Sequence, residues 1–241
     1  MKDSTLEKLV AALRRGKSDV SRLLFGGTCF LCRGAADAIL CRECDADLPR
    51  LDGPRCPRCA LASPGGALCG RCLAQPPRYD ATLAALSYDF PADALIHSFK
   101  FRGELALASV FSDLLVEKIR SDTVDLVVPV PLSAKRLRER GYNQAVELAR
   151  PLAAAARAPL ELALCERMRD APPQMELPWA ERARNVRCAF RCARSLGGAA
   201  VAVVDDVMTT GATLDEVAAT LKAAGAASVV NWVVARTLPP N

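Results

Sequence analysis

Four Cys-x-x-Cys pairs constrain the fold of this 241-residue chain more than any other feature. Each pair presents two thiolates from one tight turn, and two turns complete a tetrahedral four-sulfur site of the kind that zinc prefers. The stretch between them is broken by Gly and Pro and shows almost no apolar periodicity, so it cannot build a core by itself. The sequence therefore predicts two structural zinc ions, held by Cys29, Cys32, Cys41, Cys44, Cys56, Cys59, Cys69 and Cys72.

The spacing leaves two ways of sharing these pairs between the metals. Successive pairs can share one ion, or the first pair can join the third and the second the fourth in a cross-brace. The loops between successive pairs are short and similar in length, which favours successive pairing. A redox function is disfavoured, because a redox motif is a single Cys-x-x-Cys that opens a helix.

The composition and the apolar periodicity of the sequence change after Gln75-Pro76-Pro77, and we expect a domain boundary near Arg78. Residues 1–78 are then an N-terminal amphipathic helix, with apolar residues from Leu6 to Leu13, followed by a double zinc ribbon. In 79–241, apolar strands are predicted at 126–130, 199–204 and 228–234, and helices at 144–156 and 214–224. This alternation predicts an α/β domain with a mostly parallel sheet flanked by helices and a ligand site beyond the carboxyl ends of the strands.

Residues 201–213 form the most specific motif outside the cysteines. A buried apolar strand leads into an acidic pair and then into a loop of small and hydroxyl-bearing residues, with a helix directly after it. Main-chain N–H groups and hydroxyls at a helix N-terminus bind anions, and a glycine lets the main chain come close. The carboxylates on the strand side can accept from vicinal sugar hydroxyls. The motif predicts a site for a phosphorylated ribose, formed by Asp205, Asp206, Thr209, Thr210, Gly211, Ala212 and Thr213.

Two basic segments accompany this motif. Lys135 and Arg136 follow the predicted strand at 126–130 and precede the helix that begins near Gln144. Positive charge at a helix start opposes the helix dipole unless an anion is bound, so an anion-binding loop is favoured over a solvated one. The second segment, 167–190, begins with Arg167 and has weak periodicity, which predicts a lid over the ligand.

The cysteine pairs, the turn at 100–103, the basic segment at 135–144 and the 201–213 motif occur in one order that resembles the ComF family. In that family a double zinc ribbon precedes a type I phosphoribosyltransferase domain, similar to that of amidophosphoribosyltransferases. The resemblance implies that phosphoribosyl pyrophosphate (PRPP) binds with Mg²⁺. It adds Lys135, Arg136 and Arg167 to the PRPP-binding residues. It also implies a link to natural competence and imported single-stranded DNA, with a ComFA-type helicase or a DprA-type protein as partner.

Two functions fit this sequence. As an enzyme, the protein holds PRPP while a nucleophile displaces pyrophosphate, by positioning and charge stabilisation alone. No glutaminase domain is expected in the chain, and residues near 79–90 are expected to form the hood that recognises the acceptor. As a binding protein, the same pocket senses PRPP or a nucleotide phosphate while the ribbon contacts a protein partner. Aromatic residues are scarce between Phe30 and Tyr79, so a stacking platform for direct single-strand binding is missing there.

The charge and hydropathy patterns bear on the location of the protein. The formal net charge is +5, and the basic excess lies before residue 79, where zinc-bound thiolates would nearly cancel it. A nucleic-acid surface therefore does not follow from the net charge. No apolar run approaches the roughly 20 residues of a membrane helix, and no apolar signal-peptide centre is found near the N-terminus. We expect a cytoplasmic protein without membrane insertion.

Overall fold

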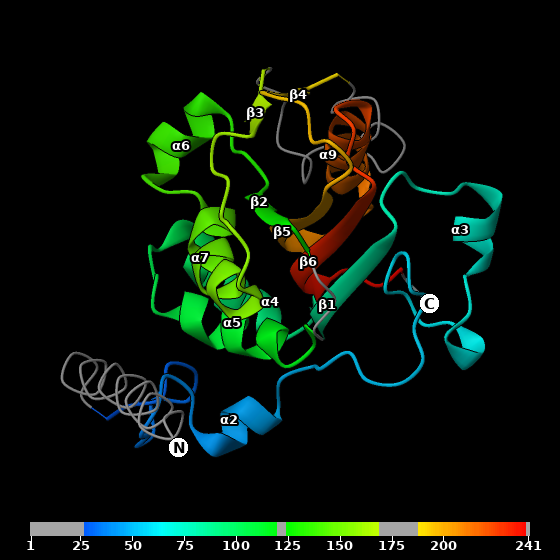
Figure 1. The fold of residues 1–241 in the computed structure, drawn as a ribbon. Helices are drawn as coiled ribbons and strands as arrows, with labels where there is room; N and C mark the ends of the chain where they lie inside the picture. The colour runs from blue at the N-terminus through cyan, green and yellow to red at the C-terminus, as the bar shows by residue number, and fades with distance from the viewer. Residues whose placement is uncertain (1–26, 120–123, 169–187, 240–241) are drawn as a thin grey trace, which may run out of the picture. The chain divides into compact units, whose positions relative to one another are not determined.

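The computed structural model describes residues 27–119, 124–168 and 188–239 (Figure 1). The chain divides into two compact units, Met1–Leu48 and Pro49–Asn241, so the second cluster of four cysteines belongs to the unit that contains the main sheet. The domain boundary expected near Arg78 stays a prediction. The N-terminal helix expected around Leu6 and most of the lid expected at 167–190 lie outside the described residues.

The first unit is a small cysteine-rich module. Helix α2 (Arg42–Ala46) begins directly after Cys41, whose sulfur accepts a hydrogen bond from the N–H of Cys44 at 3.5 Å. On the other side of the module, the N–H of Cys29 donates to the carbonyl of Gly34 at 2.7 Å and closes a tight turn. The two turns present sulfur atoms to a common centre, as a zinc ribbon requires.

The second unit contains a parallel sheet of four described strands in the order β1-β6-β5-β2. Their bounds are Ala81–Ser87 for β1, Leu126–Pro129 for β2, Ala200–Met208 for β5 and Ser228–Arg236 for β6. All three strand pairings are parallel. Near-continuous apolar runs in β5 and β6 account for this arrangement, because a parallel sheet is covered on both faces. The expected α/β fold with a mostly parallel sheet is confirmed.

Helices cover both faces of the sheet (Figure 1). Helices α5 (Leu107–Val116) and α7 (Gln144–Ala156) pack on one face, and α9 (Ala212–Ala223) packs on the other. Helix α4 (Ala92–Phe101) contacts α5, and the short helix α6 (Ala134–Arg140) follows β2. A separate antiparallel pair, β3 (Cys165–Arg167) with β4 (Phe190–Cys192), places Cys165 opposite Cys192. No helix in the described part of the chain is long and apolar enough to cross a membrane.

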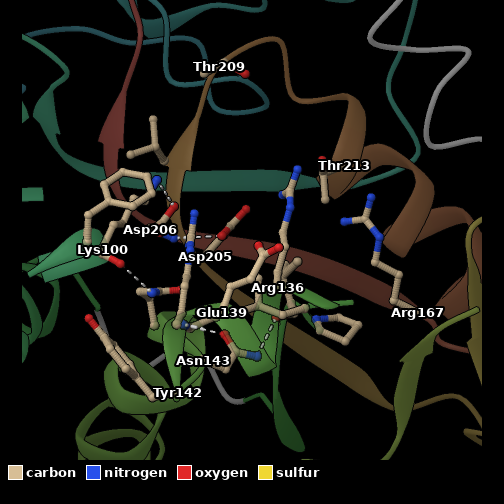
Figure 2. A pocket seen from close by; sticks show the side chains of 18 of the residues that line it. Lys100, Arg136, Glu139, Tyr142, Asn143, Arg167, Asp205, Asp206, Thr209 and Thr213 are labelled. Atoms are coloured by element: carbon tan, nitrogen blue, oxygen red, sulfur yellow. Dashed lines mark hydrogen bonds and ion pairs between the residues drawn. The ribbon is translucent and has the colours of Figure 1, made fainter. Parts of the chain in front are cut away.

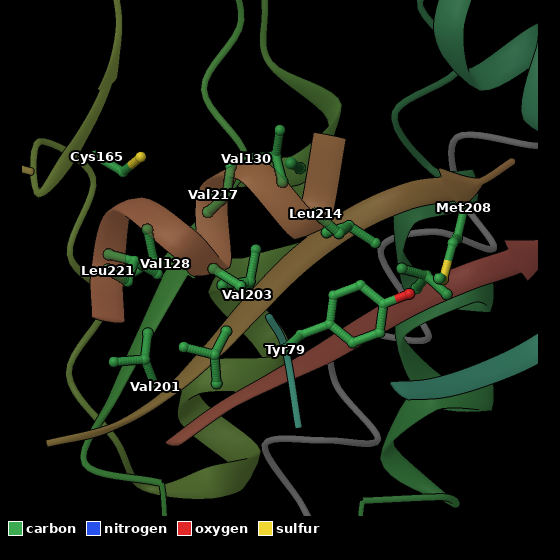
Figure 3. Packing of buried hydrophobic residues seen from close by; sticks show 14 of the residues in the cluster. Tyr79, Val128, Val130, Cys165, Val201, Val203, Met208, Leu214, Val217 and Leu221 are labelled. Carbon is green, nitrogen blue, oxygen red and sulfur yellow. The ribbon is translucent and has the colours of Figure 1, made fainter. Parts of the chain in front are cut away.

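The second ribbon shares its core with the sheet. It contains a 3₁₀ turn, η1 (Pro64–Gly66), and helix α3 (Gly70–Ala74). Figure 3 shows Val203 of β5 and Leu214 of α9 in the buried cluster. The same cluster also contains Cys56, Cys59 and Cys72. Burying such side chains contributes about 1 to 3 kcal/mol each, so this ribbon is part of the folded core.

Most of the segment expected to form a hood, 79–90, is an edge strand of the main sheet, and its role in recognising an acceptor stays a prediction. Strand β1 pairs with β6 from Ala81 to Ser87, and Leu86 is fully buried. The alternation of Ala and Leu in this stretch has no clear strand or helix period, so its strand state depends on pairing with β6, which comes about 150 residues later in the chain.

Candidate functional site

The two cysteine clusters have the geometry of zinc sites. One cluster is Cys29, Cys32, Cys41 and Cys44, and in each cluster the four ligand atoms lie within 4.8 Å of one another. Successive pairing is therefore confirmed. The N–H of Cys69 donates to the sulfur of Cys56 at 3.4 Å in the second cluster. Burial opposes ionisation of Cys56, but main-chain N–H donors from Cys69, Cys59 and Arg58 outweigh it and lower the pKa of this thiol to about 6. Burial raises the pKa of Cys72 in the same cluster, so the fit to zinc rests on the geometry, in which four sulfur atoms lie close enough to share one tetrahedral ion.

The acidic pair lies inside β5, near its carboxyl end, and not in the loop that follows. Figure 2 shows Asp205 and Asp206 between Lys100 on one side and Arg136 and Arg167 on the other. The Nζ atom of Lys100 lies 2.8 Å from Oδ1 of Asp206. Burial, together with the charge of Asp206, raises the pKa of Asp205 to about 7, and the positive charge of Lys100 opposes this shift. Asp206 is thus paired in the free protein, and Asp205 is about half ionised at neutral pH.

The hydroxyl-rich loop connects β5 to the N-terminus of α9. Gly211 is the N-cap of α9 and adopts a left-handed conformation with φ of 87°. The hydroxyl of Thr210 accepts from the N–H of Ala212 at 3.1 Å, and Thr209 and Thr213 line the cavity beside the acidic pair. The first N–H groups of a helix have no partner within the helix, so they are suited to a phosphate.

The basic segment after β2 is a helix rather than a loop. Ser133 caps α6 by accepting from the N–H of Arg136 at 3.4 Å. Arg136 lines the cavity, whereas Lys135 is exposed, lies outside the lining and pairs with Glu139 at 4.0 Å. Because α6 is a helix of seven residues, neighbouring side chains lie on different faces, and Lys135 and Arg136 therefore point in different directions.

Other residues of the site were not among the predicted binding residues. Arg140 lies over the ring of Phe101 at 4.8 Å and donates to Oε1 of Gln144 at 3.0 Å. Burial lowers the pKa of Arg140, and the charge of Asp206 opposes the shift. Asn143 donates to the carbonyl of Val130 at 3.1 Å and fixes the turn after α6. The local signal for these residues was the basic run at 135–144, but only the fold shows which of them face the ligand.

A cavity of about 870 Å³ brings most of the predicted binding residues together. Asp205, Asp206, Thr209, Thr213, Arg136 and Arg167 line it, and Thr210, Gly211, Ala212 and Lys135 do not. Residues added by the structure include Lys100 from the end of α4 and Tyr88 after β1. Arg167 comes from β3, where it lies over the ring of Phe190 at 5.6 Å. The cavity therefore combines carboxylates, hydroxyls and guanidinium groups at the carboxyl ends of β2 and β5.

Substitution of Gly211 tests how tightly the loop is built. A Cβ at this position would lie 2.7 Å from Cε of Met208 and 3.0 Å from Oη of Tyr79. We expect Gly211→Ala to lower the free energy of unfolding by about 3 kcal/mol, from positive φ and overpacking together. The matched control is Gly53→Ala, which has a similar φ of +78° with nothing within 4 Å, and we expect about 1 kcal/mol there. Urea denaturation gives both values, and equal losses of unfolding free energy would show that the loop relaxes to accommodate the added Cβ.

Comparisons with known proteins agree with this organisation. The family model of the double zinc ribbon domain matches residues 20–73. The DNA utilization protein YhgH of Escherichia coli K12 is 35% identical over 223 residues, which cover 88% of this chain and 98% of that protein. Competence protein F of Haemophilus influenzae is 31% identical over 226 residues, with the same coverage. Competence protein ComFC of Bacillus subtilis is 30% identical over 212 residues, or 83% of this chain and 85% of that protein.

Among solved structures, glutamine PRPP amidotransferase from B. subtilis is similar to part of the chain, with a TM-score of 0.36 and 23% identity. The similarity covers 52% of this chain and 26% of the amidotransferase, so this chain spans about a quarter of that enzyme's length.

Proposed function

The chain belongs to the ComF family, and from that premise we propose that it binds PRPP in the cavity at the carboxyl ends of β2 and β5, as part of the uptake or use of DNA. Relatives that it matches over most of their length are named for competence and for DNA utilization. One observation supports this ligand most directly: the acidic pair, Thr209, Thr213 and three arginines line the same cavity.

Each group in the cavity suits one part of PRPP. Asp205 and Asp206 can accept from the ribose hydroxyls, and the N-terminus of α9 with Thr209 and Thr213 suits the 5-phosphate. Arg136 and Arg140 suit the pyrophosphate, because a guanidinium donates two parallel hydrogen bonds to a phosphate. Mg²⁺ is expected to enter with the phosphates of the ligand. Lys100, which pairs with Asp206 in the free protein, is close enough to exchange that partner for a phosphate oxygen.

Calorimetric titration with PRPP and Mg²⁺ tests the proposal directly. We expect saturable binding with one ligand per chain, and ribose 5-phosphate should bind more weakly because it lacks the pyrophosphate. Release of pyrophosphate in the presence of candidate bases or amines then separates a phosphoribosyltransferase from a PRPP sensor. Absence of binding to both ligands, in zinc-replete and folded protein, would refute the proposed function.

The pKa of Asp205 predicts how binding depends on pH. Its carboxyl is mostly protonated below about pH 7 and mostly ionised above it, because burial and the charge of Asp206 raise its pKa against the opposing charges of Lys100 and Arg167. Because the ionised form is the better acceptor for ribose hydroxyls, we expect the affinity for ribose 5-phosphate to rise about tenfold between pH 6 and pH 8. Asp205→Asn is the control, since it keeps the titration of the ligand phosphate and removes that of the carboxyl. A pH dependence that is unchanged in this variant would contradict the prediction.

A further inference from the structure

A buried arginine at the end of β6 connects the second cysteine cluster to the phosphate loop. The side chain of Arg236 is fully buried, and its Nε donates to the carbonyl of Cys59 at 2.9 Å. Its Nη1 donates to the carbonyl of Met208 at 2.9 Å, to that of Thr237 at 2.8 Å and also to that of Thr209. One guanidinium thus holds a metal-binding turn and the last residues before the phosphate loop at the same time.

Two more residues join the same parts of the molecule. Arg71 lies between Cys69 and Cys72 on α3, and its Nη2 donates to the carbonyl of Thr210 at 2.7 Å. The hydroxyl of Tyr79 is directed toward Met208, the last residue of β5 (Figure 3). A Cβ at Gly211 would meet the side chains of Met208 and Tyr79, so packing as well as hydrogen bonds restrains the main chain of the loop.

Charge explains why an arginine is tolerated in this position. The Nε of Arg236 lies 2.9 Å from the carbonyl oxygen of Cys59, so the guanidinium lies next to the second cysteine cluster. A zinc ion with four thiolates carries a net charge of about −2, so a metal-loaded cluster supplies the counter-charge that a buried guanidinium needs. The hydrogen bonds of Arg236 go to main-chain carbonyls, which are strong acceptors for a charged donor.

We propose that Arg236 and Arg71 are positioning residues that make the conformation of the phosphate loop depend on the second zinc site. When that site is formed, the two arginines fix three successive carbonyls, those of Met208, Thr209 and Thr210, directly before Gly211 at the start of α9. Of these three residues, Thr209 lines the cavity. When the site is lost, the counter-charge and the anchor at Cys59 go with it, and the loop loosens. The effect on ligand affinity rests on the proposed function, but the effect on the loop itself does not.

Hydrogen–deuterium exchange of the full, zinc-loaded chain tests the loop without a ligand. We expect Arg71→Ala to speed amide exchange in the peptide that covers 207–213 about fivefold, which corresponds to one lost hydrogen bond. Arg58→Ala is the matched control, because Arg58 lies in the same ribbon but donates to the carbonyl of Pro77 instead. Arg71→Lys should restore slow exchange, since an ammonium can donate to the same carbonyl. Equal exchange in the Arg71→Ala, Arg58→Ala and unsubstituted proteins would overturn the proposal.

A second measurement uses ribose 5-phosphate as the probe. We expect its affinity to fall about fivefold in Arg71→Ala and about tenfold in Arg236→Lys, which keeps the charge but cannot reach all four carbonyls. A merely structural role would lower the unfolding temperature and leave the affinity unchanged at a temperature well below unfolding. If the unsubstituted protein does not bind ribose 5-phosphate, the proposed function fails, and the exchange experiment still decides whether the arginines hold the loop.

Discussion

Replacing Cys59 by serine is expected to destabilise the sheet-containing unit by more than about 4 kcal/mol, because the change removes a zinc ligand from inside the core. The side chain of Cys59 is fully buried, and it belongs to the same cluster as Val203 and Leu214. Loss of the metal would also leave Arg236 buried without its counter-charge. Thermal unfolding followed by circular dichroism, with the zinc content measured in parallel, gives the size of the effect.

Cys32→Ser in the first cluster is the matched control. Cys32 is exposed and belongs to the unit Met1–Leu48, so its loss should release one zinc ion and leave the main unfolding transition of the sheet nearly unchanged. Similar drops in unfolding temperature for the two variants would show that the second cluster contributes no more than the first to the stability of the sheet-containing unit.

The double substitution Asp205→Asn, Asp206→Asn is expected to weaken PRPP binding by more than about a hundredfold. Hydrogen bonds to charged groups contribute about 1.5 to 3 kcal/mol each, and two carboxylates are removed together. The loss should not come from unfolding. Because the pKa of Asp205 is raised above its unfolded value near 4, its ionisation lowers the free energy of unfolding as the pH rises from about 4 to about 7. The neutral amide of Asn does not ionise, so it does not lower the free energy of unfolding in this way.

Calorimetric titration at pH 8 measures this effect, with Asp93→Asn as control. Asp93 lies in the first turn of α4, where its Oδ1 accepts from the N–H of Ala94 at 2.6 Å, and it does not line the cavity. Unchanged affinity in the double variant would show that the acidic pair does not face the ribose, and the ligand would then have to be sought elsewhere. The denaturation curve of the double variant confirms that the comparison is between folded proteins.

The sequence by itself determined the features that depend on short-range chemistry. The Cys-x-x-Cys pairs, an apolar strand that leads into the acidic pair, the glycine at the start of α9 and the helix after it are each encoded within about 15 residues, through metal-ligand spacing, apolar periodicity and capping. The parallel sheet also followed, because apolar strands alternating with helices have few other ways to pack.

Only the tertiary structure decided which side chains meet. Lys100 reaches Asp206 although about 100 residues separate them, and Arg236 reaches Cys59 across 177 residues. Strand β1 likewise depends on its pairing with β6. Which side chains of α6 face the cavity depends on the direction in which this short helix leaves β2. No local pattern encodes such contacts, because they arise when distant elements bury their apolar faces together and the polar groups left inside must find partners.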